Sequence, residues 1–247
     1  MNEFVRCHKL DEQEAQLLAE LRCCTIFSRN LDLDSLQSVV LERRELSLKF
    51  TEIYDRLLEG VHDRAAQDVV REIIREEYPG PDPAGGNLGL SHREDLVHDL
   101  ERLGISRSRV ISHKPSRQTR GVINATFHVI HKILSKADPQ LQAIAFIRFW
   151  GEVLTAVEYE SLWHVGLSRS FKSPADSTFY WFHLIHDRAN RGFSDIRAPG
   201  YRSAFTHSDH LTLRLADLLN QNDRVDEVME ANRKATSLKT AFYRQFG

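Results

Sequence analysis

The sequence predicts an all-α protein that forms one helical domain over residues 1–247. Apolar residues recur at the three- and four-residue spacing of helices over most of the chain. Residues that cap helices, such as Ser, Asn and Asp, precede many of these stretches. No stretch alternates apolar and polar residues in the manner of a β-strand, and no repeat or interdomain linker interrupts the pattern. A single bundle of eight or nine helices is therefore expected.

The expected helices follow one another with short breaks. Residues 1–10 form an irregular lead-in, the Pro- and Gly-rich stretch 79–90 is a break, residues 105–115 form a basic loop, and residues 191–201 form another break. Ser91 and Gly104 are expected to begin and end one helix, and Asp138 with Pro139 to begin the longest one. The helices are expected at about residues 11–24, 34–61, 63–78, 91–103, 116–136, 138–167, 174–190, 203–219 and 223–243.

Composition narrows the range of partners and locations. The 33 basic and 35 acidic residues nearly balance, so a nucleic-acid-binding surface is not implied. Three cysteines, Cys7, Cys23 and Cys24, have no framework spacing and indicate a reducing, cytoplasmic setting. The charged amino-terminal stretch lacks a signal core, and no apolar run is long enough to span a membrane. We expect neither nucleic acid nor membrane as a partner, and a homodimer stays open.

One acidic residue interrupts the apolar face of the longest helix. Glu158 shares this face with six residues, of which five are apolar and one is glycine: Ile144, Ile147, Gly151, Leu154, Leu162 and Val165. An ionised carboxylate that faces a core must be paired, protonated or bound to metal. Glu152, four residues after Arg148, is assigned instead to an ion pair on the surface. Glu158 is therefore a candidate metal ligand.

Two further polar residues face inward near the Gly-rich break. Glu77 shares a helix face with Val70 and Ile73, whereas Glu76 lies above Glu72, although Glu76 stays open as a replacement for Glu77. His92 lines the same side of the next helix as three leucines. Glu77 alone is equally compatible with an ordinary charged helix end. For His92 alone, a core or capping histidine is the simpler interpretation, so neither residue defines a site by itself.

The segment STFYWFHLIHDRAN concentrates groups that can bind metal. His183 and Asp187, four residues apart, can point at one centre, as paired ligands on a helix do. Farther on, His207 continues an apolar stripe and His210 flanks it. Carboxylate and imidazole ligands from separate helices suit iron or manganese, and about six ligands suit two metal ions. The candidate metal ligands are Glu77, His92, Glu158, His183, Asp187, His207 and His210.

This ordered set resembles the haem-oxygenase-like diiron oxidase and oxygenase superfamily, which has the TenA-like fold, and in particular its CADD-like branch. The family pattern is a Glu that ends one core helix, a His that opens the next, and a Glu ahead of a Gly-Leu pair. An aromatic helix with His-x3-Asp-x2-His follows. Here EEYPG and SHRED supply Glu77 and His92, VEYESLWHVGL supplies Glu158, and FYWFHLIHD supplies His183 and Asp187. The likeness covers roughly residues 45–220.

The last histidine of the family triplet falls on Asn190, which is a poor metal ligand. His207 or His210 could replace it if the chain folds back; alternatively, Ser203, His207 and His210 have the triplet spacing themselves. The resemblance implies two Fe(II) ions per chain, one of them weakly held, with O2 as co-substrate. It also implies a small organic substrate, which is amino-acid-like, fatty-acid-like or of the aminobenzoate type.

Two other functions compete with this oxidase hypothesis. One is a metal-free TenA-like hydrolase, which would need a nucleophilic cysteine in the pocket. The other is a non-enzymatic helical interaction protein whose inward polar groups are merely satisfied. Metal analysis separates the oxidase hypothesis from both.

Overall fold

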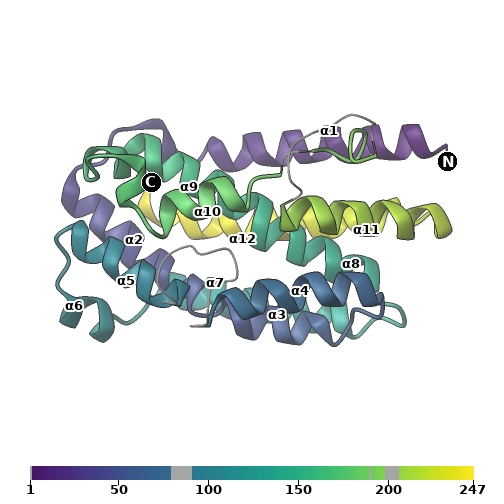
Figure 1. Ribbon diagram of the computed structural model, residues 1–247, viewed down its shortest axis with the longest axis horizontal. Helices are drawn as coiled ribbons and strands as arrows, with labels where there is room; N and C mark the ends of the chain where they lie inside the picture. The colour runs from purple at the N-terminus through teal and green to yellow at the C-terminus, as the bar shows by residue number, and fades with distance from the viewer. Residues whose placement is uncertain (1, 79–90, 190, 198–205) are drawn as a thin grey trace.

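The computed structural model describes residues 2–78, 91–189, 191–197 and 206–247, and these residues form a helical bundle without strands (Figure 1). Short 3-10 turns, η1 (Thr25–Ser28), η3 (Leu167–Arg169), η4 (Pro174–Asp176) and η5 (Arg244–Phe246), join or end the helices. A π-helix, η2 (Ile147–Val153), lies between α8 and α9. The helices are α1 (Glu3–Arg22), α2 (Leu33–Ser47), α3 (Phe50–Leu58), α4 (Arg64–Glu76), α5 (His92–Arg102), α6 (Arg107–Ser112), α7 (Arg117–Leu134), α8 (Gln140–Phe146), α9 (Leu154–Val165), α10 (Tyr180–His186), α11 (His207–Gln221) and α12 (Val225–Tyr243).

The described residues confirm the all-α prediction and most helix positions. The side chains of Asp63, Ser91 and Ser116 each accept a hydrogen bond from the N–H three residues later, as N-caps do. Because these signals are local, they fixed the starts of α4, α5 and α7 correctly. None of the described helices is both long and apolar enough to cross a bilayer.

Four sequence expectations about the elements are wrong. Residues 3–10 of the expected lead-in belong to α1, whose N-cap Asn2 accepts a hydrogen bond from the N–H of Phe4. The basic loop contains α6, which Ser106 caps. The helix expected over 34–61 divides into α2 and α3. The helix expected to reach residue 190 ends at His186; Asn190, Ser203 and the break at 198–201 lie outside the described residues.

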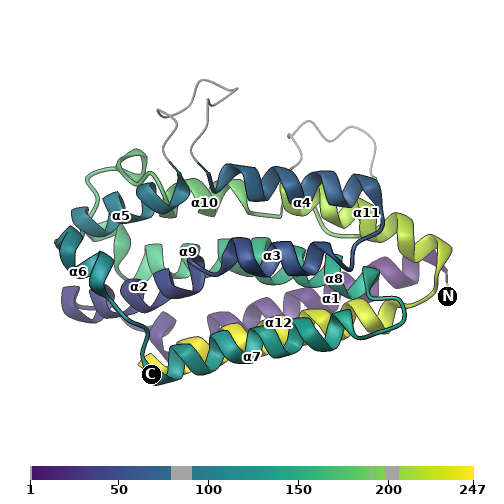
Figure 2. The same cartoon turned by 90° about the horizontal axis from the view of Figure 1, so that it is seen from below.

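The long helix expected over 138–167 runs through the centre of the bundle as α8, the π-helix and α9. Figure 2 shows it in the middle tier with α2 and α3, between an upper tier of α5, α10, α4 and α11 and a lower tier that contains α7 and α12. The π-helix and α8 are buried on all sides, which leaves no solvent-facing stripe. The central helix faces the upper tier of α4, α5, α10 and α11, and most of the candidate metal ligands lie in or next to these four helices.

The expected surface pair between Arg148 and Glu152 is wrong. Both side chains are buried, and the guanidinium of Arg148 instead binds the carboxylate of Glu14 on α1, with Nη2 3.0 Å from Oε2. A π-helix adds a residue to its turn, so spacing counted at 3.6 residues per turn through residues 147–153 assigns side chains to the wrong face. Glu152 consequently faces the interior.

Candidate metal centre

Glu77 and His92 meet although 15 residues separate them in the sequence. Glu77 lies just after the last turn of α4, and His92 opens α5 behind its cap Ser91. The Nδ1 of His92 lies 3.3 Å from Oε1 of Glu77. Burial opposes protonation of His92, but the hydrogen bond and charge of Glu77 outweigh it and raise the pKa of the imidazole. The ends of α4 and α5 thus supply one carboxylate–imidazole pair.

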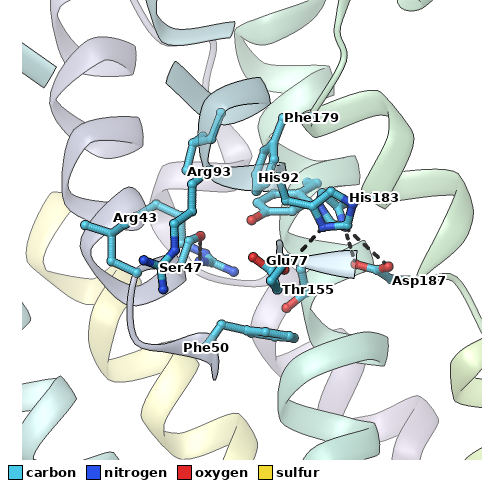
Figure 3. A pocket seen from close by; sticks show the side chains of 13 residues that line it. Arg43, Ser47, Phe50, Glu77, His92, Arg93, Thr155, Phe179, His183 and Asp187 are labelled. Atoms are coloured by element: carbon cyan, nitrogen blue, oxygen red, sulfur yellow. Dashed lines mark hydrogen bonds and ion pairs between the residues drawn. The ribbon is translucent and has the colours of Figure 1, made fainter. Parts of the chain in front are cut away.

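Helix α10 supplies a second pair. The Nδ1 of His183 lies 3.2 Å from Oδ2 of Asp187, and the rings of His92 and His183 meet edge to face with centroids 4.7 Å apart. Figure 3 shows His92, His183 and Asp187 together on one side of a pocket, with Glu77 directed toward them. The structure therefore brings together the four candidates Glu77, His92, His183 and Asp187.

Asp99 of α5 fixes the start of α10. Its buried carboxylate accepts from the hydroxyl of Ser177 at 2.6 Å and from the backbone N–H groups of Phe179 and Tyr180 at 3.1 and 3.2 Å. These N–H groups would otherwise lack partners at the helix start, and the negative charge suits the positive end of the helix dipole. Asp99 thereby sets the direction in which α10 presents His183 and Asp187.

A second group of candidate ligands lies on the other side of Asp187. Glu76, His186 and His207 each offer an atom within 4.8 Å of the others, and Nε2 of His207 lies 3.4 Å from Oε1 of Glu76. The Nδ1 of His186 lies 3.3 Å from Oδ1 of Asp187. Because the other oxygen of Asp187 contacts His183, this one carboxylate joins the two groups.

The second group bears on two alternatives that the sequence left open, Glu76 against Glu77 and His207 against His210. Glu76 does not replace Glu77, because each carboxylate contacts a different histidine. His207, the first residue of α11, is buried, whereas His210 is exposed, so the structure supports only His207 of the two. Sequence analysis missed His186 as a ligand; its place three residues after His183, on the same side of α10, was the available signal.

Glu152 is the other residue that sequence analysis missed. It is buried, and its Oε1 accepts a hydrogen bond of 2.6 Å from the hydroxyl of Tyr54 on α3. Burial and then the nearby charge of Asp187 raise the pKa of Glu152 well above its ordinary value, and Glu76 and Glu77 act in the same direction. Glu152 is therefore within electrostatic range of carboxylates from both groups of candidate ligands.

Glu158 does not join these groups, which corrects the sequence expectation. Its carboxylate is fully buried, and Oε2 is 2.9 Å from Nζ of Lys239 and 2.8 Å from Nη2 of Arg43. Both cations come from helices distant in the sequence, α2 and α12. The inward Glu was correctly expected to need a partner, but that partner is a pair of cations instead of a metal ion.

The assembled donors fit a dinuclear metal site. The Nε2 atom of His183 is buried without a hydrogen-bond partner among the described residues, as expected of an imidazole nitrogen that awaits a ligand. Burial lowers the pKa of His207 to about 4, which keeps this imidazole neutral and able to coordinate. Burial opposes ionisation of Asp187, but His183 and His186 outweigh it and lower its pKa to about 2. Four carboxylates and four imidazoles thus converge.

The pocket beside the first group of candidate ligands is also lined by polar and aromatic side chains. Arg43, Ser47 and Thr155 line it together with the aromatic rings of Phe50 and Tyr159 (Figure 3). The lining of the pocket thus combines charged, polar and aromatic side chains. None of the cysteines lines it, and burial raises the pKa of the Cys24 thiol, which disfavours the nucleophilic thiolate.

Together, the bundle and its interior carboxylates and histidines define the class of protein: the chain has the haem-oxygenase-like fold. It is similar to a domain of unknown function with this fold from Shewanella denitrificans, at TM-score 0.66 and 13% identity over 97% of this chain and 90% of that one. A CADD-like protein of unknown function from Nostoc punctiforme matches at TM-score 0.66 and 14% identity, over 98% of this chain and 94% of that one.

A TenA homolog from Pseudomonas syringae pv. tomato matches less closely, at TM-score 0.59 and 11% identity, over 97% of this chain and 91% of that one. At such identities these likenesses establish the fold alone. No protein-family model and no curated protein sequence matches the chain.

Proposed function

We propose that this protein is a non-haem diiron oxidase or oxygenase that uses O2 to act on a small organic substrate. The observation that carries the proposal is the position of Asp187, whose two oxygens contact His183 and His186 and so join two groups of buried and partly buried candidate ligands. One iron would be held by Glu77, His92 and His183, and the other by Glu76, His186 and His207, with Asp187 and Glu152 beside both.

The charge of the donor set supports two divalent ions. Glu76, Glu77, Glu152 and Asp187 carry four negative charges when all are ionised, and two Fe(II) ions carry four positive charges. Without the ions, mutual repulsion and burial favour the protonated form of Glu152, whose pKa is raised. Metal binding should therefore release protons. Bound iron would supply electrons for the reduction of O2.

The chain itself supplies the orientation of the ligands and the walls of the pocket. Tyr54 donates a hydrogen bond to one oxygen of Glu152, and Asp99 accepts hydrogen bonds at the start of α10. Glu152 and α10 are thus each positioned by a residue outside the candidate ligand set. The aromatic rings of Phe179 and Tyr159 pack on His183, with centroids 4.4 and 6.1 Å from its ring. These rings exclude water from the side of the pocket where the substrate would lie.

Anaerobic titration with Fe(II) tests the proposal. We expect about two Fe(II) per chain, and we expect Glu76→Gln and Glu152→Gln to lower this stoichiometry. Glu72→Gln is a matched control, because Glu72 is an exposed glutamate one turn before Glu76 on α4. Exposure of the loaded protein to O2 with amino-acid, fatty-acid and aminobenzoate candidates then tests turnover. Failure of the wild type to bind more than trace iron would refute the proposal.

A further inference from the structure

In the buried cluster of Arg43, Glu158 and Lys239, two cations bind one carboxylate, although one cation would be enough to balance its charge. All three side chains are at most 5% exposed, and both cations bind the same carboxylate oxygen, Oε2. The other oxygen, Oε1, is buried without a hydrogen-bond partner among the described residues. With every group ionised, the cluster carries one surplus positive charge in the protein interior.

This surplus charge can be released as a proton from Lys239 only. Arginine keeps its proton in proteins, whereas a buried lysine shifts its pKa readily. Loss of one proton from Lys239 leaves the neutral Arg43–Glu158 ion pair, in which Nε donates a hydrogen bond of 2.9 Å to Oε2 and Nη2 lies 2.8 Å from the same oxygen. The deprotonated cluster is therefore electrically balanced.

Thr155 connects Lys239 to the pocket. The Nζ of Lys239 lies 3.3 Å from Oγ1 of Thr155, and Thr155 lines the pocket together with His183 and Asp187. As a donor, this hydroxyl makes only one long contact among the described residues, with the carbonyl of Trp150 at 3.5 Å. This hydroxyl can consequently accept a proton from Lys239 on one side and donate its own on the other.

We propose that Lys239 is a proton donor to the pocket, acting through the hydroxyl of Thr155. An N–H bond of Lys239 breaks as an O–H bond forms at Thr155, and the original hydroxyl proton of Thr155 passes to an acceptor in the pocket. The amine of Lys239 is left neutral beside the Arg43–Glu158 pair. The use of this proton in O2 reduction, which consumes protons, depends on the proposed function; the connection between Lys239 and the pocket does not.

The electrostatic surroundings suit such a donor. Burial lowers the pKa of Lys239 to about 7; Glu158 opposes this shift, Arg43 adds to it, and Asp187 of α10 opposes it more weakly. Tyr159 of α9, Tyr243 of α12 and Cys24 just before η1 also act on Arg43 or Glu158, and burial raises the pKa of each. A general acid is most effective when its pKa lies near the working pH.

Nuclear magnetic resonance of the metal-free protein, with 15N in the lysine side chains, tests the connection directly. We expect the Lys239 ammonium signal, assigned by its loss in Lys239→Met, to titrate near neutral pH. Thr155→Val should slow exchange of the Nζ protons with solvent by on the order of tenfold, and Thr155→Ser should retain most of the exchange rate. Thr126→Val, which removes a buried hydroxyl from α7, is the matched control and should leave exchange unchanged.

Two results with the metal-free protein would overturn the inference. Titration of Lys239 at the ordinary lysine value of about 10.4 would show that the cluster holds its proton. Equal exchange rates in Thr155→Val and the wild type would show that Thr155 carries no proton. Either result would leave the proposed diiron function intact.

Single turnover of the iron-loaded protein tests the use of the proton. Thr155→Val should lower the rate on the order of 10²-fold with iron stoichiometry unchanged, and Thr155→Ser should restore most of it. The rate should fall as pH rises through the pKa of Lys239, and this fall should be absent in Lys239→Met. Wild-type protein that binds no iron would defeat the proposed function, while the exchange experiment would still decide the proton path.

Discussion

Replacement of Gly151 by alanine is expected to destabilise the protein, against the usual effect of this change in a helix. Glycine in the middle of a helix is normally about 0.5–1 kcal/mol less stable than alanine. In the π-helix, however, a Cβ on Gly151 would lie 1.8 Å from the hydroxyl oxygen of Tyr54 and 2.7 Å from its Cζ. Tyr54 is fully buried and its ring stacks on Phe50 with centroids 4.1 Å apart, so the ring has no free space into which to move.

The magnitude follows from two costs and one gain. Overpacking of a buried site costs about 1–3 kcal/mol. Displacement of Tyr54 also breaks its hydrogen bond to Glu152, which contributes about 1 kcal/mol. The intrinsic helix preference of alanine returns up to about 1 kcal/mol. Gly151→Ala should therefore lower the free energy of unfolding by roughly 2 kcal/mol.

Urea denaturation of the metal-free protein measures this change. Gly121→Ala is the matched control, because Gly121 lies in the interior of α7 and a Cβ there would meet no atom within 4 Å. The control should gain about 0.5–1 kcal/mol, so the two variants should differ in sign. The double variant Gly151→Ala/Tyr54→Phe should recover part of the loss, because it removes the atom at 1.8 Å. A Gly151→Ala protein as stable as the wild type would refute the proposed packing around Glu152.

Three further predictions concern stability and metal binding. Glu158→Gln should lower the free energy of unfolding by about 3 kcal/mol, because it leaves two buried cations without their carboxylate. The iron stoichiometry of this variant should stay at about two per chain, and loss of one iron from the folded variant would show that Glu158 is a ligand. Asp99→Asn should weaken iron binding about tenfold, since the start of α10 loses its charged acceptor, and competition with a chelator measures this; unchanged affinity would exclude Asp99 as a positioning residue. Because the pKa of His207 is lowered in the folded protein, the unfolded chain binds a proton first as the pH falls. This residue should therefore cost about 3 kcal/mol of folding stability as the pH falls from its ordinary pKa of 6.5 to about 4, and nothing above pH 6.5. In thermal unfolding without metal, the melting temperature of His207→Gln should decline less steeply at acid pH than that of the wild type, and parallel curves would contradict the burial of a neutral imidazole.

Local signals in the sequence identified most of the helices and five of the eight donors of the candidate site, the fifth being His207, which was one of two alternatives. Caps and apolar spacing act within a few residues, so they identified the helices without knowledge of their partners. The same spacing selected Glu77 at the end of α4, His92 at the start of α5, and the pair His183 and Asp187 on α10. These four helix-borne residues lie together in the structure as the ordered pattern implied.

Tertiary structure decided the rest, for reasons that helical spacing does not contain. Helix α8 and the π-helix are buried on every side, and the π-helix shifts the register, so spacing alone could not tell that Glu152 faces the candidate ligand groups. Nor could it show that Glu158 is satisfied by Arg43 of α2 and Lys239 of α12, because an inward carboxylate is equally well balanced by a metal ion or by cations from distant helices.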